Sequence, residues 1–218
     1  SVWERYVSTL ALRYRGKIKY WEIWNEADSQ KFYSGSYERL AELEKVAAEQ
    51  LRRIDPTNVI LSPSFQGGAF GKLERYLNAG GARYADVISY HFYTPRDEPE
   101  AARPLIVKVQ SILRKHGLNR LPLWNTEVGY LIPDSKGSFG GERKSSWGHW
   151  KALEPASAKD VLIRSFLINL SSGVERIVWY SWDHKAMGLS ESKGARPKDA
   201  SFAFVLIAKW LRDAAELQ

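Results

Sequence analysis

Apolar residues along the chain follow two spacings, one typical of helices and one typical of buried strands. In the longest helical stretch Leu40, Leu51 and Ile54 fall on one stripe, which Asp55-Pro56 ends. The same spacing predicts helices over residues 3–14, 37–54, 73–77, 101–116, 157–171 and 202–217. An S-x-x-D start signal at residues 157–160 marks the beginning of the fifth helix.

Short runs of aromatic and aliphatic residues separate these helices. They lie at residues 18–24, 59–62, 86–93, 121–125 and 176–182. Runs of this length are typical of parallel strands that are buried on both faces. Strand and helix therefore alternate, which predicts an α/β fold with a parallel sheet. A long Gly- and Ser-rich stretch at residues 133–154 interrupts the alternation.

The favoured architecture is a (β/α)8 barrel of the TIM type, with a doubly wound open sheet as the alternative. An open sheet usually carries a Gly-rich phosphate turn after its first strand, and Asn25-Glu26-Ala27-Asp28 is not such a turn. The 218 residues hold five predicted βα units of about 44 residues, whereas a barrel has eight. We therefore expect residues 1–218 to form one domain, an incomplete barrel that lacks its first three units.

Two glutamates that follow predicted strands are the main candidates for chemistry. Glu26 comes just past the strand at 18–24, and Glu127 just past the strand at 121–125. A carboxylate in such apolar surroundings is costly unless it is paired or in use. In barrels the catalytic groups lie at the carboxyl ends of the strands, and glycoside hydrolysis uses a pair of carboxylates. Glu22 lies on the same side of the predicted strand as Glu26. For Glu22 we favour a structural role as the buried partner of an arginine over a catalytic one.

Four strand ends carry polar and aromatic residues in a specific order. The motifs are Trp24-Asn25-Glu26, Tyr90-His91-Phe92-Tyr93, Thr126-Glu127 and Tyr180-Ser181-Trp182. In this order and register the chain resembles the clan A glycoside hydrolases, closest to family 39 and next to family 5. The resemblance covers essentially the whole chain, as the fourth to eighth βα units of that barrel. It implies a glycoside hydrolase, involved in carbohydrate metabolism and polysaccharide degradation.

The resemblance also implies roles for the residues beside the scissile bond. Glu26 matches the acid/base and Glu127 the nucleophile of a retaining β-glycosidase, which cleaves O-glycosidic bonds by double displacement. Asn25 matches the residue that binds the 2-hydroxyl of the sugar. The chemistry requires no metal and no organic cofactor. Ala27-Asp28 departs from the Pro-Asn that often follows the acid/base, and the family's Arg on the second strand and polar residue on the third have no counterpart here.

Further substrate-binding residues come from the later strands. His91 and Tyr93 resemble the sixth-strand pair that supports the nucleophile, and Trp182 matches the platform under the sugar. Trp147 and Trp150 lie in the long stretch after Glu127, where they either line outer sugar subsites or pack within the loop.

The composition of the chain limits the classes of partner that it is expected to bind. Nine Trp and eleven Tyr suit stacking on sugars, although large cores use such residues too. The net charge of +7 is spread without a dense basic block, which favours a solvated basic surface over nucleic-acid binding. No run approaches the roughly 18 apolar residues of a membrane helix. The absence of Cys excludes disulfides and thiolate metal sites and leaves the compartment open.

Two other functions remain as alternatives to a glycosidase, and each predicts a different experimental signature. A carbohydrate-binding pseudoenzyme on a barrel scaffold would bind sugar without turnover. A different hydrolase or a metal-dependent barrel enzyme ranks third, because the histidines do not cluster like metal ligands and no Asp-x-Asp-x-Glu run of the chitinase type occurs. Loss of activity with a chelator would favour the metal-dependent enzyme. As the partner we expect a carbohydrate substrate. An open barrel would also expose apolar surface, which predicts self-association.

Overall fold

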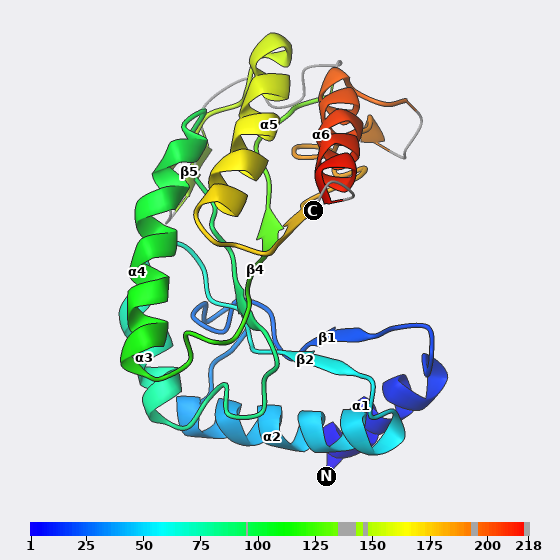
Figure 1. Ribbon diagram of the computed structural model, residues 1–218, viewed down its shortest axis with the longest axis vertical. Helices are drawn as coiled ribbons and strands as arrows, with labels where there is room; N and C mark the ends of the chain where they lie inside the picture. The colour runs from blue at the N-terminus through cyan, green and yellow to red at the C-terminus, as the bar shows by residue number, and fades with distance from the viewer. Residues whose placement is uncertain (95, 135–142, 146–147, 193–195, 216–218) are drawn as a thin grey trace. The chain divides into compact units, whose positions relative to one another are not determined.

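Helices and strands alternate along the chain in the computed structural model (Figure 1). The structure describes residues 1–94, 96–134, 143–145, 148–192 and 196–215. The helices are α1 (Val2–Arg13), α2 (Tyr37–Ile54), α3 (Phe70–Asn78), the 3-10 turn η1 (Pro99–Ala101), α4 (Ala102–Lys115), α5 (Pro155–Ser171) and α6 (Asp199–Ala215). The strands are β1 (Tyr20–Glu22), β2 (Val59–Leu61), β3 (Ile88–Tyr90), β4 (Leu123–Val128), β5 (Arg143–Ser145), β6 (Gly148–Trp150) and β7 (Arg176–Trp179).

The chain divides into two compact units. Unit 1 consists of Ser1–His91 and Lys108–Thr126, and unit 2 of Phe92–Val107 and Glu127–Gln218. Helix α4 and strand β4 both continue from one unit into the other. The single domain predicted for residues 1–218 stays a prediction.

Unit 1 contains parallel strands in sequential order. β1 pairs with β2, β3 pairs with β4, and an isolated parallel bridge from Leu61 to Val87 joins the two pairs. The register places these residues opposite one another: Tyr20 and Val59, Trp21 and Ile60, Glu22 and Leu61, Ile88 and Leu123, Ser89 and Trp124, Tyr90 and Asn125. Parallel strands in chain order, each separated by a helix, are the repeating unit of a (β/α) barrel.

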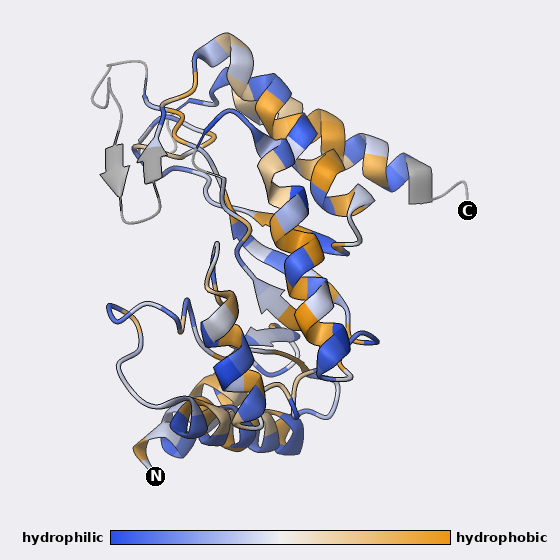
Figure 2. Cartoon of the chain, turned by 90° about the vertical axis from the view of Figure 1, so that its left-hand side faces the viewer, coloured by the Kyte–Doolittle hydropathy of each residue, from blue (hydrophilic) through white to orange (hydrophobic). Residues whose placement is uncertain are grey.

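Helices α1 and α2 cover strands β1 and β2 with apolar side chains. Leu51 of α2 is buried against Ile60 of β2, in a cluster that also includes Val7 of α1. Burying such a side chain contributes about 1.5–3 kcal/mol. Ser36 caps α2, because its Oγ accepts a hydrogen bond from the backbone N of Arg39 at 3.2 Å. The helices alternate hydrophobic and hydrophilic positions, as this packing requires (Figure 2).

A buried carboxyl ties α2 to the connection between α3 and β3. The Tyr76 hydroxyl donates a hydrogen bond to Glu44 Oε2, and the backbone N of Ala82 donates to the same oxygen at 2.9 Å. Glu44 is fully buried. Burial raises the pKa of its carboxyl, and the hydrogen bonds from Tyr76 and Ala82 oppose that rise in part.

Unit 2 is organised around two helices and the end of β4. Helices α5 and α6 lie side by side (Figure 1), with Phe166 and Ile207 in their shared core. The backbone N of Tyr180 donates to Val128 O at 2.8 Å and so continues β7 alongside β4. This approach is close at Gly129, where an added Cβ would lie 2.0 Å from the Tyr180 carbonyl oxygen.

The observed elements differ from the predicted ones mainly at their ends. β1, β3 and β7 are shorter than their apolar runs, whereas β4 continues to Val128, so that Glu127 lies inside the strand instead of just past it. Helix α5 begins at Pro155 and not at Ser157, since proline at the first helical position already has the required φ. The stretch at 133–154 contains an unpredicted pair of antiparallel strands, β5 and β6. Within the described part of the chain, no helix combines the length and apolar character needed to cross a membrane.

Candidate active site

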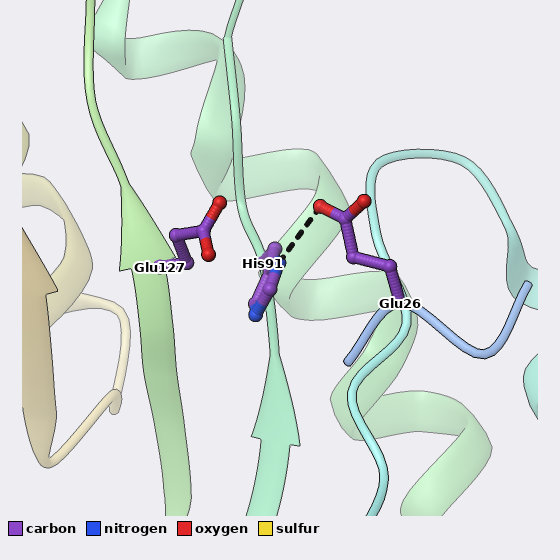
Figure 3. A group of neighbouring side chains, drawn as sticks. All are labelled: Glu26, His91 and Glu127. Atoms are coloured by element: carbon purple, nitrogen blue, oxygen red, sulfur yellow. Dashed lines mark hydrogen bonds and ion pairs between the residues drawn. The ribbon is translucent and has the colours of Figure 1, made fainter. Parts of the chain in front are cut away.

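Glu26 lies in the loop that follows β1, and both of its carboxylate oxygens have partners. Gln66 Nε2 donates to Oε2 at 2.7 Å, and His91 Nδ1 lies 3.0 Å from Oε1 (Figure 3). All three residues belong to unit 1, and each is at least nine-tenths buried. The carboxylate is therefore held in one orientation by two side chains that follow β2 and β3.

The backbone at Glu26 adopts an unusual conformation. Its φ is 44°, in the left-handed region where a residue with a Cβ is disfavoured by about 1–2 kcal/mol. The Ser64 side chain supports this turn, because its Oγ accepts a hydrogen bond from the Glu26 N at 3.0 Å. Strain of this kind persists only where surrounding contacts enforce it, and it is concentrated at functional sites.

Asp28 is a second buried carboxyl close to Glu26 in sequence. The backbone N of Gln66 donates to Asp28 Oδ1 at 3.1 Å, and Lys72 Nζ donates to the Asp28 carbonyl oxygen at 2.6 Å. Burial raises the pKa of Asp28, its backbone hydrogen bonds oppose the rise, and the charge of Glu26 adds to it. The sequence had shown Asp28 only as a departure from the family pattern.

Gln66 belongs to the candidate site although the sequence pattern did not predict it. It follows β2 and forms an isolated parallel bridge with His91, which places its amide beside Glu26. A glutamine in a loop carries no signal of its own. Its equivalence to the other strand ends, one βα unit after Glu26, is the only feature that could have drawn attention to it.

His91 lies between two glutamates of unit 1. Its Nδ1 faces Glu26, and its Nε2 lies 3.8 Å from Glu22 Oε1. The partner of Glu22 in the structure is thus His91, whereas the sequence favoured an arginine. The structure places His91 against the predicted acid/base, and its predicted support of the nucleophile stays a prediction.

Glu127 of unit 2 is held by the other member of the predicted pair. The Tyr93 hydroxyl donates to Glu127 Oε1 at 2.8 Å. The Tyr93 ring packs edge-on against Trp150, with ring centroids 5.5 Å apart. Trp150 therefore packs against a site residue, while Trp147 lies outside the described residues. Tyr93 thus contacts Glu127, and the supporting role that the resemblance implied for this tyrosine stays a prediction.

Asn25 and Trp182 are both exposed. Asn25 lies directly before Glu26, and 57% of Trp182 is exposed. The chain reaches Trp182 from β7 through a cis peptide bond between Tyr180 and Ser181. Their sugar-binding roles stay predictions. The structure thus joins Glu26 with His91 in unit 1 and Glu127 with Tyr93 in unit 2.

Neither a protein-family model nor a curated protein matches the chain, but solved structures share its fold. A GH128 (subgroup I) endo-β-1,3-glucanase from Amycolatopsis mediterranei, in complex with laminaritriose, aligns with a TM-score of 0.66 and 21% identity, over 94% of this chain and 79% of that one. A GH39 β-xylosidase from Caulobacter crescentus aligns with a TM-score of 0.64 and 20% identity, over 93% and 46%. A glucosidase from Croceicoccus marinus aligns with a TM-score of 0.66 and 16% identity, over 95% and 45%.

These alignments confirm the predicted fold class. The chain has an α/β fold of the (β/α)8-barrel type, in incomplete form, and it shares that fold with barrel glycoside hydrolases. It spans less than half the length of the glucosidase and of the β-xylosidase.

Proposed function

We propose that the protein is a retaining β-glycosidase that hydrolyses O-glycosidic bonds of an oligo- or polysaccharide. The observation that carries the proposal is how the two glutamates are held. His91 orients Glu26 within unit 1, and Tyr93 orients Glu127 within unit 2. The two orienting residues follow β3 and are two positions apart, a spacing that puts side chains on one face of an extended chain. We infer that both glutamates act on one sugar.

The contacts suggest how each glutamate would work. Tyr93 occupies Oε1 of Glu127, so Oε2 attacks the anomeric carbon while the leaving oxygen takes a proton from Glu26. The glycosidic bond breaks as the bond to Glu127 forms. Glu26 then accepts a proton from water, and the water oxygen displaces Glu127 from the same carbon. Two inversions give net retention at the anomeric carbon.

The remaining predicted residues would recognise the sugar. Asn25 would bind the 2-hydroxyl, and Trp182 has the exposed ring that a stacking platform requires. The structural neighbours named above include an endo-β-1,3-glucanase and a β-xylosidase. We propose a β-linked substrate on this basis.

The test is hydrolysis of aryl β-xylosides, aryl β-glucosides and laminarin, with the product anomer followed by proton NMR. We expect the β-anomer to form first. Glu127→Ala should lower kcat by at least about 10³-fold, because the nucleophile is lost. Glu26→Ala should lower it by about 10²–10⁴-fold, and added azide should restore turnover of substrates with good leaving groups.

Glu175→Ala is the matched control, since Glu175 is an exposed glutamate before β7. It should keep the parent rate. An inverted product, or a Glu127→Ala variant as active as the parent, would contradict the proposal. Sugar binding without turnover by the parent would instead identify a carbohydrate-binding pseudoenzyme.

A further inference from the structure

A cavity of about 430 Å³ lies within unit 1, lined by residues of α1, α2, β1 and the loop after β1. Small-molecule sites typically have volumes of about 300–1,000 Å³. Much of the wall is aromatic, and it includes Trp3 and Tyr6 of α1 together with Trp24 and Phe32 after β1. Tyr6 is 56% exposed and Phe32 48% exposed. Exposed apolar side chains that gather around a cavity are typical of a binding site.

The aromatic rings of this wall are fixed in place. Trp3 Nε1 donates to Leu43 O at 2.8 Å, and Trp24 Nε1 donates to Phe32 O at 3.0 Å. The rings of Trp3 and Tyr6 stack with centroids 5.8 Å apart, and the centroids of Trp3 and Trp24 are 5.5 Å apart. Because the two indole N–H groups already have acceptors, the rings present apolar surface in a set geometry. A ligand therefore does not have to immobilise them when it binds.

Two polar side chains line the same cavity. Asn25 is exposed, and Glu22 Oε1 lies 3.8 Å from His91 Nε2, which is too far for a hydrogen bond. Among the residues that the structure describes, neither the Asn25 amide nor the Glu22 carboxylate has a hydrogen-bond partner. The amide can donate and accept, and an ionised carboxylate accepts only. Hydroxyl groups of a ligand would satisfy both side chains.

We propose that this cavity is a subsite for a neutral, β-linked oligosaccharide. The inference rests on the proposed function, because Trp24 and Asn25 line the cavity and directly precede Glu26. A sugar chain held at Glu26 would continue onto these rings. A pyranose has apolar C–H faces for the aromatic wall and hydroxyls around its rim for Asn25 and Glu22.

The charge of Glu22 distinguishes this ligand from two others. An acidic sugar would be repelled by the carboxylate, which gives the lining a negative charge. An apolar peptide would cover the carboxylate without pairing it, and burial of an unpaired charge is costly. A neutral sugar donates hydrogen bonds to it instead.

Tyr6→Ala and Phe32→Ala test the subsite, because both side chains are exposed and the fold does not depend on burying them. Isothermal titration of laminarihexaose and xylohexaose into protein that also carries Glu127→Gln measures binding without hydrolysis. We expect each substitution to weaken binding of the preferred hexasaccharide by about tenfold, a typical effect of losing one aromatic contact. Leu12→Ala is the control, since Leu12 is an exposed apolar residue of α1 that does not line the cavity. Its affinity should equal that of the parent.

Substrate length provides a kinetic readout. In Tyr6→Ala the KM for the hexasaccharide should rise by about tenfold, whereas kcat/KM for an aryl β-monosaccharide should stay at the parent value, because one sugar at Glu26 does not reach the cavity. An equal loss with both substrates would contradict a subsite. Binding of anilinonaphthalene sulfonate that Tyr6→Ala abolishes, in a parent that binds neither hexasaccharide, would overturn the proposal and identify a site for an apolar ligand.

The two readouts separate the failure of the inference from the failure of the proposed function. A parent that binds a hexasaccharide through Tyr6 and Phe32 but never hydrolyses it would contradict the proposed function and support the sugar site. A parent that hydrolyses aryl β-glycosides, with hexasaccharide affinity unchanged in Tyr6→Ala and Phe32→Ala, would overturn the subsite and leave the proposed function intact.

Discussion

Glu44 shows how a single buried carboxyl links pH to stability. Its folded-state pKa is raised, chiefly by burial, above an unfolded value of about 4.3. The protonated form therefore favours the folded state. This contribution is complete below about pH 4, and it is lost as the pH rises through the folded-state pKa.

Glu44→Gln should remove that pH dependence. Relative to the parent, the variant should gain stability as the pH rises from about 4 to 7, because glutamine avoids the cost of a buried charge while still accepting from Tyr76. Chemical denaturation at a series of pH values measures the difference. A parent-to-variant difference that is constant over this range would contradict the prediction.

At the residue scale the sequence identified the glutamates but not the groups that hold them. Glu26 and Glu127 were predicted because each follows an apolar run. A carboxylate in such surroundings is costly unless it is paired or takes part in chemistry. Gln66 was not predicted, since its contact with Glu26 joins residues 40 positions apart. Asp28 was visible as an exception to a pattern, but its burial follows from the packing of the loop after β1.

The presence of each helix and strand was easier to predict from the sequence than the residues at which it begins and ends. Helix α2 matches its predicted bounds because Asp55-Pro56 ends it in the sequence itself. Strand ends are less predictable because apolar runs continue past the last paired residue. Ile23, for example, is buried although β1 ends at Glu22. The antiparallel strand pair β5–β6 was not predicted, since a Gly- and Ser-rich composition indicates a loop.

Gly129 is the position where the end of β4 is most sensitive to substitution. In Gly129→Ala the new Cβ would lie 2.0 Å from the Tyr180 carbonyl oxygen, so the backbone must shift two residues after Glu127. Overpacking of this kind costs about 1–3 kcal/mol. We expect a lower melting temperature and a loss of the proposed glycosidase activity larger than the loss of folded protein.

Gly71→Ala provides the comparison for this substitution. Gly71 lies in α3, and an added Cβ there would meet nothing within 4 Å. Because alanine is the better helix former, this variant should be as stable as the parent or more stable by up to about 1 kcal/mol. Thermal melts of both variants measure the difference in stability. A Gly129→Ala variant with the melting temperature of the parent would show that the strand end tolerates the shift.

At the scale of the whole molecule, the βα alternation was enough to predict the barrel type. The solved structures confirm that type without determining the sugar, which depends on loops that vary among barrel enzymes. Five predicted units correspond to five parallel or helix-linked strands, β1, β2, β3, β4 and β7, in the described residues. The alternation of strands and helices can be read from residues that are close together in the sequence. The shape of a loop depends on contacts with distant residues and cannot be read in this way.

The predicted self-association has a candidate surface on α6. Phe202, Val205, Leu206 and Trp210 recur at helical spacing and are 40–66% exposed. We propose that a second copy of the chain covers this face, since a two-fold contact would use the same apolar patch on both copies.

Val205→Lys combined with Trp210→Lys should then abolish concentration-dependent association in sedimentation velocity experiments. Val107→Lys is the control, because Val107 is an exposed valine on α4, away from that face. A parent that sediments as a monomer at every concentration would contradict the prediction.

The interleaving of the two units affects the order in which the chain can fold during synthesis. The chain leaves unit 1 after His91, returns at Lys108 and leaves again after Thr126. On the ribosome, β3 can complete its pairing only after β4 has emerged, and the first segment of unit 2 emerges before unit 1 has its last strand. Neither unit can be expressed as one continuous segment, and a break in the chain near residue 108 would divide both.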